Sequence, residues 1–124
     1  MGKDRLESER DFHNEAFSTG IRKPLDPYYT VFRQMRSVFR HRIESLAPGN
    51  NLLECGCGVS SYAPEFAPFA RSITGIDISD EAVRQSEVQA HKLGLENCRF
   101  RVMNAEQMDF SENSFSLCFG SGII

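Results

Sequence analysis

Two acidic residues, each at the end of a short apolar run, are the residues of this sequence best placed to do chemistry. Glu54 ends the first run and is followed by Gly56 and Gly58, and Asp77 ends a second run at 72–77. The two glycines can adopt backbone angles closed to other residues and let a ligand approach the main chain. A strand that leads through a glycine loop into a helix is typical of nucleotide sites in α/β proteins.

The spacing of these residues indicates which nucleotide fits. In dinucleotide-binding folds an acid about 20 residues beyond the glycine loop accepts hydrogen bonds from ribose hydroxyls, and Asp77 lies where that rule requires. Glu54 differs, because a carboxylate in the mouth of the loop would repel a pyrophosphate. Ser61 also stands where the dinucleotide fingerprint has its third glycine. We therefore expect a nucleoside that carries hydroxyls and a positive charge.

The elements that must position these residues alternate along the chain. Ser79 predicts the start of a helix that Gly94 ends. Strands are expected at 51–55, 72–77, 98–103 and 115–120, helices at 1–17, 30–47, 60–69 and 80–93, and a loop at 18–29. This alternation predicts an α/β fold with a parallel sheet and right-handed crossovers.

Four blocks of sequence, in order, resemble class I S-adenosylmethionine-dependent methyltransferases, and more narrowly their ubiquinone/menaquinone-type and small-molecule branch. The blocks are Leu-Leu-Glu-Cys-Gly-Cys-Gly-Val-Ser from residue 52, Gly-Ile-Asp-Ile-Ser from residue 75, Asn104-Ala105-Glu106, and 115–120. The resemblance covers residues 50–124. It implies a Rossmann-like partial domain there, with strands in the order 3-2-1-4, and a helical lead-in at 1–49.

The resemblance also implies roles for individual residues. Glu54 would help to hold the methionine end of the cofactor, Asp77 would bind both ribose hydroxyls, and Ile78 would lie against the adenine. The implied cofactor-binding set is Glu54, Gly56, Cys57, Gly58, Asp77, Ile78, Asn104, Ala105, Glu106 and Gly120. Asn104 and Ser116 depart from the family, which usually has acids at both positions. The alternatives that remain open are a plain strand-to-helix turn for the glycines, a backbone cap for Glu54 and a core position for Ile78.

Charge and composition narrow the partners. A chain of 124 residues makes one domain at most, and its 40% hydrophobic and 25% charged residues are typical of a globular protein. No apolar stretch approaches the length of a membrane helix, and the charged N-terminus does not resemble a secretory signal, so we expect a cytoplasmic protein. The net charge of −3, divided as +2 in residues 1–49 and −5 in 50–124, disfavours nucleic acid and suits a cationic sulfonium.

The four cysteines predict small buried thiols in a reduced compartment. Cys55 and Cys57 have the spacing of one metal-binding pair, but no second pair at ligand spacing follows. Cys98 and Cys118 fall in expected strands. We therefore predict no metal site.

The expected function is methyl transfer from S-adenosylmethionine to a small molecule, with S-adenosylhomocysteine as the product. No general base is identifiable, and none is needed when the sulfonium is already activated and orientation suffices. One alternative is a nicotinamide-dependent oxidoreductase, which Glu54 and Ser61 disfavour. The other is a binding remnant without turnover. The sequence identifies neither the acceptor nor a catalytic residue.

The last expectation concerns the end of the sequence. Members of the family usually continue after strand four with a helix, a fifth strand and a hairpin, whereas this sequence stops at Ile124. We expect either a fragment of a longer enzyme or self-association as a homodimer through the apolar edge of strand 115–120, with little turnover from this polypeptide alone. Phe12, Tyr28 and Tyr29 are candidates to close over the site.

Overall fold

A computed structural model describes residues 4–19 and 33–121. Its helices and strands follow the predicted alternation. They are α1 (Arg5–Thr19), α3 (Arg33–Leu46), β1 (Asn51–Cys55), α4 (Ala63–Phe66), β2 (Ser72–Asp77), α5 (Asp80–Lys92), β3 (Cys98–Val102) and β4 (Leu117–Gly120). Helix α1 extends to Thr19, two residues beyond the predicted end of that helix at 17 and into the loop expected at 18–29, and the rest of that loop lies outside the described residues.

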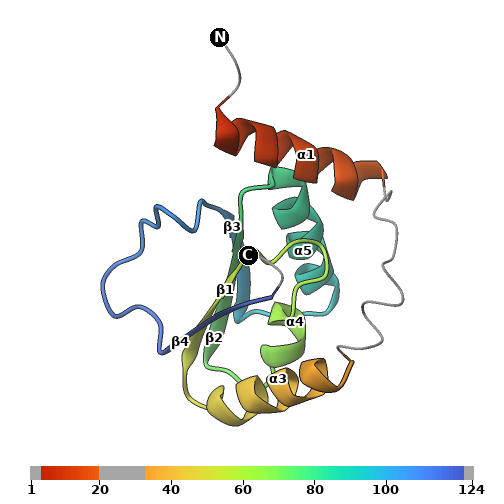
Figure 1. Ribbon diagram of the computed structural model, residues 1–124. Helices are drawn as coiled ribbons and strands as arrows, with labels where there is room; N and C mark the ends of the chain where they lie inside the picture. Colours follow the sequence, from red (N-terminus) through yellow and green to blue (C-terminus); the bar gives the residue numbers. More distant parts are fainter. Residues whose placement is uncertain (1–3, 20–32, 122–124) are drawn as a thin grey trace.

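The sheet has four parallel strands in the order β3-β2-β1-β4, as predicted (Figure 1). Helices α3, α4 and α5 lie on one side of this sheet, and the long segment between β3 and β4 lies on the other (Figure 1). Because the strands are parallel, their carboxyl ends meet at one edge, where the residues singled out in the sequence are brought together.

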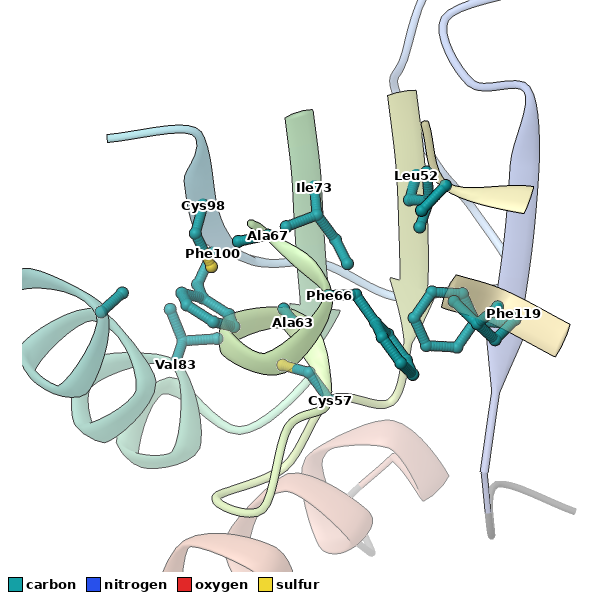
Figure 2. Close-up of a cluster of buried hydrophobic side chains, with 13 residues drawn as sticks. Leu52, Cys57, Ala63, Phe66, Ala67, Ile73, Val83, Cys98, Phe100 and Phe119 are labelled. Carbon is teal, nitrogen blue, oxygen red and sulfur yellow. The ribbon is translucent and has the colours of Figure 1, made fainter. Parts of the chain in front are cut away.

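Aromatic and aliphatic side chains fill the space between the sheet and the helices (Figure 2). Phe66 of α4 is fully buried, and its ring lies 5.7 Å from that of Phe119 on β4. Gly75 of β2 admits the ring of Phe100, since a Cβ atom there would lie 2.7 Å from that ring. Full burial of such a side chain contributes about 1.5–3 kcal/mol, so packing on this face stabilises the sheet against the helices.

The opposite face of the sheet carries a smaller apolar cluster. Leu53, Ile76 and Met103 are buried there, and Phe110 and Phe115 pack against them with their rings edge to face and 4.7 Å apart. These two rings belong to the segment between β3 and β4, which contains no helix or strand. An irregular segment therefore covers this face, where helices cover the other.

Some boundaries are tighter than predicted. Helix α4 occupies Ala63–Phe66 rather than all of 60–69, since Pro64 fits the first turn of a helix and side-chain contacts hold the preceding residues in a turn. Strand β4 begins at Leu117 rather than at 115, where it first pairs with Leu52 of β1. Strand β3 ends at Val102, one residue early.

The prediction that all four cysteines are buried is wrong for Cys118. Cys57 and Cys98 are buried and Cys55 is half-buried, whereas Cys118 is exposed; all four are free thiols. Side chains alternate along β4, so that Phe119 faces the helices and Cys118 faces the other side.

Helix α3 is confirmed, but its apolar residues are only partly covered. Ile43 is buried and Phe39 packs against the helix-side cluster. Met35 and Val38 are 63% and 71% exposed. None of the helices described in the structure is both long and apolar enough to cross a membrane.

Candidate functional site

The glycine loop leaves β1 with two residues in the left-handed region. Gly56 has φ 67° and Gly58 has φ 55°. A side chain in this region costs about 1–2 kcal/mol, so both positions call for glycine. Between them, Cys57 donates its N–H to the carbonyl of Ile76 at 3.0 Å and buries its thiol in the helix-side cluster (Figure 2). Cys57 can therefore reach a ligand through its backbone and not through sulfur.

Asp77 joins the end of β2 to this loop. Its Oδ2 accepts from the N–H of Gly58 at 2.9 Å, and its Oδ1 accepts from the N–H of Ser79 at 2.9 Å. A carboxylate has about four lone-pair sites, so two remain for a ligand. Because Asp77 is half-buried rather than enclosed, the remaining sites are open to hydroxyl donors.

Ser79 begins α5, as the sequence predicted. Its Oγ accepts from the N–H of Ala82 at 3.1 Å, which satisfies a donor of the first turn. Asp77 therefore does not cap this helix, which leaves its carboxylate to the glycine loop and to a ligand.

Glu54 has the opposite environment, with only 3% of the residue exposed. Its Oε1 accepts from the hydroxyl of Ser61 and its Oε2 accepts from the N–H of Tyr62 at 3.1 Å. Burial raises the pKa of Glu54 to about 6, although these hydrogen bonds act in the other direction. These contacts are those of a backbone cap, the alternative that the sequence left open. A contact between Glu54 and a ligand stays a prediction.

Ser61 explains why the third glycine of the fingerprint is absent. Its hydroxyl donates to Glu54 and accepts from the N–H of Ala63 at 2.9 Å. A glycine could make neither contact. Ser61 therefore links the buried acid to the first turn of α4, a role that its position in the sequence did not reveal.

The segment after β3 contributes Asn104, Ala105 and Glu106. The Oδ1 of Asn104 accepts from the N–H of Glu106 at 2.9 Å, which forms a local turn and leaves a second lone pair on that oxygen. Ala105 and Glu106 are exposed, and Glu106 pairs with Arg5 of α1 at 2.9 Å.

The remaining predicted residues lie at the same edge of the sheet. Ile78 is half-buried directly after β2, and Gly120 ends β4 opposite Cys55. Phe12 of α1 is exposed, and Tyr28 and Tyr29 lie outside the described residues. Within the described ranges, no group of three His, Cys, Asp or Glu residues could hold a metal ion.

Sequence reasoning missed the residues of α1 that contact the site, Arg5 on Glu106 and two more at the end of β2. The Nε of Arg10 donates to the carbonyl of Ile78 at 2.8 Å, and the Oδ1 of Asn14 accepts from the hydroxyl of Ser79. More than 60 positions separate each of these pairs along the chain. No motif or periodicity links residues so far apart, so only the fold could reveal the contact.

The sequence model of a family described as a methyltransferase domain matches residues 46–124. The chain belongs to this family. With the parallel sheet in the order 3-2-1-4, this places it among the class I S-adenosylmethionine-dependent methyltransferases, as the four sequence blocks predicted.

Named relatives differ in what they methylate. The chain is 31% identical over 75 residues to the 23S rRNA (uracil(747)-C(5))-methyltransferase RlmC of Vibrio vulnificus. The aligned segment covers 60% of this chain and 20% of that protein. The chain is also 30% identical over 112 residues to the sterol 24-C-methyltransferase ERG6A of Gibberella zeae. This aligned segment covers 89% of this chain and 28% of that protein. The chain thus spans less than a third of either relative.

A solved structure shares the fold over almost the whole chain. The magnesium protoporphyrin IX methyltransferase ChlM of Synechocystis aligns with a TM-score of 0.64, covering 97% of this chain and 59% of ChlM. At 18% identity, this likeness is one of fold alone.

Proposed function

We propose that this chain binds S-adenosylmethionine at the carboxyl ends of β1, β2 and β3 and forms the cofactor-binding part of an enzyme that methylates a small molecule. One observation carries the proposal. The carboxylate of Asp77 is held 2.9 Å from the N–H of Gly58 while keeping lone pairs for two hydroxyl donors. A ribose presents such a pair of hydroxyls.

The donor set fits this cofactor in part. Asp77 fits the ribose hydroxyls, and the free lone pair on the Oδ1 of Asn104 fits the amino group of an adenine. The backbone of the glycine loop would face the methionine portion. Glu54 does not fit a direct contact as well, because both of its oxygens already accept hydrogen bonds within the turn. Its contribution to the site is to shape the loop.

The bound cofactor would supply a methyl group already activated on a sulfonium. The residues of this chain would then bind and orient it, since in-line geometry accounts for much of the acceleration in such reactions. Phe110 and Phe115 pack against Leu53, Ile76 and Met103 on the face of the sheet that the helices do not cover.

We infer the class of methyl acceptor from the charge of the chain. Residues 50–124 carry five Lys or Arg and ten Asp or Glu, a net charge of −5 that would repel a phosphate backbone. A relative whose name gives a sterol as its acceptor agrees with a small molecule. The relative named as an rRNA methyltransferase supports the alternative of an RNA acceptor. Binding of a short RNA that weakens steeply with added salt would favour that alternative.

Calorimetric titration with S-adenosylhomocysteine tests cofactor binding. We expect saturable binding by the wild-type protein and much weaker binding by Asp77→Ala. Glu96→Ala serves as the matched control, because Glu96 is an exposed acid at the opposite end of the sheet, just before β3. Absence of binding at millimolar ligand by a folded protein would refute the proposal. Saturable NADH binding that S-adenosylhomocysteine cannot displace would favour an oxidoreductase.

The proposal also includes location, turnover and self-association. The free thiols suit a reduced, cytoplasmic environment. Because the aligned part covers so little of the relatives, we expect cofactor binding with little turnover from these residues alone.

Among described residues β4 pairs only with β1, and its open edge carries no charge, so we expect two copies of the chain to associate through this edge. Light scattering over a concentration series tests this, and a monomer at high concentration would contradict it.

A further inference from the structure

Helix α1 lies across the end of the sheet at which β2 leads into α5 (Figure 1). It contacts both segments that flank the proposed adenosine position. Toward the end of β2, Arg10 donates to the carbonyl of Ile78 at 2.8 Å. Toward the end of β3, the guanidinium of Arg5 forms hydrogen bonds of 3.0 and 2.9 Å to the two carboxylate oxygens of Glu106. One helix thus bridges the two loops between which the adenine would lie.

The side chain of Asn14 forms hydrogen bonds with three successive residues at the start of α5. Its Nδ2 donates to Asp80 at 2.8 Å, while its Oδ1 accepts from the hydroxyl of Ser79 and, at 3.3 Å, from the N–H of Glu81. Ser79 in turn donates its N–H to Asp77. A continuous chain of hydrogen bonds therefore runs from α1 to the carboxylate proposed to bind the ribose.

These contacts are polar. Those of Arg5 and Arg10 and the hydrogen bond from Asn14 to Asp80 are exposed, whereas the hydrogen bonds that Asn14 accepts from Ser79 and Glu81 are partly buried. The side chains of Arg5 and Glu106 are 61% and 65% exposed. The buried residues of both apolar clusters, as far as the structure describes them, come from α3 and the elements after it. Exposed ion pairs and single hydrogen bonds are weak, whereas a buried apolar face is costly to separate. Among the side chains that the structure describes, α1 therefore adds none to the buried clusters, and its separation from the loops would leave those clusters intact.

We propose that α1 is a releasable clasp over the adenosine end of the site, and that Arg5, Arg10 and Asn14 set how fast a nucleoside ligand enters and leaves. This inference rests on the proposed function. With the clasp closed, the loops after β2 and β3 are held at a fixed separation and Ser79 orients Asp77. With it open, the same loops are free to admit or release the ligand.

The test measures exchange rates as well as affinity. Dissociation of S-adenosylhomocysteine is followed by stopped-flow competition in the wild-type protein, Arg10→Ala, Asn14→Ala and the double variant. We expect dissociation to be about tenfold faster in each single variant and faster still in the double variant, with association unchanged or faster. Arg84→Ala is the matched control, because Arg84 pairs with Glu81 within α5; it should exchange ligand as the wild-type protein does.

A second readout needs no ligand. Hydrogen exchange at the N–H of Glu81 should be faster in Asn14→Ala than in Arg84→Ala, because only Asn14→Ala removes the oxygen that accepts from this N–H. Unchanged dissociation in all clasp variants of a protein that binds ligand would overturn the clasp and leave the proposed function standing. A wild-type protein that binds no S-adenosylhomocysteine would overturn the proposed function and the clasp with it.

Discussion

Glu54 and Asp77 lie at the ends of neighbouring parallel strands, and both accept hydrogen bonds from backbone N–H groups. Their environments differ. Glu54 is almost fully enclosed, and burial raises its pKa to about 6, whereas Asp77 is half-buried and accepts only one hydrogen bond on each oxygen from the described residues. A buried carboxylate whose oxygens accept hydrogen bonds from the protein holds the local backbone, while a partly exposed carboxylate with unused acceptor sites can bind a ligand. The comparison teaches that an acid at a strand end is assigned a role by its access and its remaining acceptor sites, not by its position.

The largest expected effect comes from breaking the loop that both acids hold. Gly56→Val should abolish binding of S-adenosylhomocysteine, because a branched side chain is strained at φ 67° and fills space beside the ligand. Gly49→Val is the control, since Gly49 has φ 75° with open space around it, at the other end of β1. Both variants should lose stability, and only Gly56→Val should lose binding in calorimetry. Normal binding of S-adenosylhomocysteine by Gly56→Val would show that the glycine loop is not part of the binding site.

Removing the open acid should affect binding more than folding. Asp77→Ala should weaken binding of S-adenosylhomocysteine by about 1.5–3 kcal/mol, the range for hydrogen bonds to a charged group. The N–H groups of Gly58 and Ser79 lose a partner, but water can replace it at a half-buried site, so the fold should persist. Circular dichroism and calorimetry on the same sample separate the two effects. An unfolded variant would show that Asp77 has a structural role.

Neutralising the buried acid should change the pH dependence of stability. Between pH 4.5 and about 6, folded Glu54 holds its proton while the unfolded chain has lost it, so this residue makes stability fall as pH rises through that window. The shift corresponds to about 2 kcal/mol. The unfolding free energy of Glu54→Gln, measured in urea, should therefore rise by about 2 kcal/mol relative to that of the wild-type protein as the pH is raised from about 4 to about 7. A difference that is constant with pH would mean that Glu54 is not penalised by burial.

The smallest effect is expected from Ser61→Gly, which restores the third glycine of the fingerprint. It removes the hydroxyl that contacts Glu54 and the N–H of Ala63, at a cost of about 1 kcal/mol in unfolding free energy. The cost should shrink when Glu54→Gln is already present, because the two residues share a contact. Purely additive costs would contradict the coupling.

Much of the fold follows from local pattern. The bounds of β1 and β2 were predicted to the residue, since apolar runs flanked by breaks define buried parallel strands, and Ser79 was recognised as the cap of α5. The site was predicted less completely. Nothing in the sequence distinguished the burial of Glu54 from that of Asp77, because burial depends on Ser61 and Tyr62 closing over one acid and not the other. The contacts of α1 depend on residues more than 60 positions apart and could not be predicted from spacing.

The central claim is that Asp77, not Glu54, contacts the ribose of the ligand. The most direct test compares the affinities of S-adenosylhomocysteine and its 2′-deoxy analogue in the wild-type protein, Asp77→Ala and Glu54→Gln. We expect the wild-type protein and Glu54→Gln to prefer the hydroxylated ligand by about tenfold, and Asp77→Ala to bind both ligands alike. The same preference in Asp77→Ala as in the wild-type protein would contradict the claim, as would its loss in Glu54→Gln.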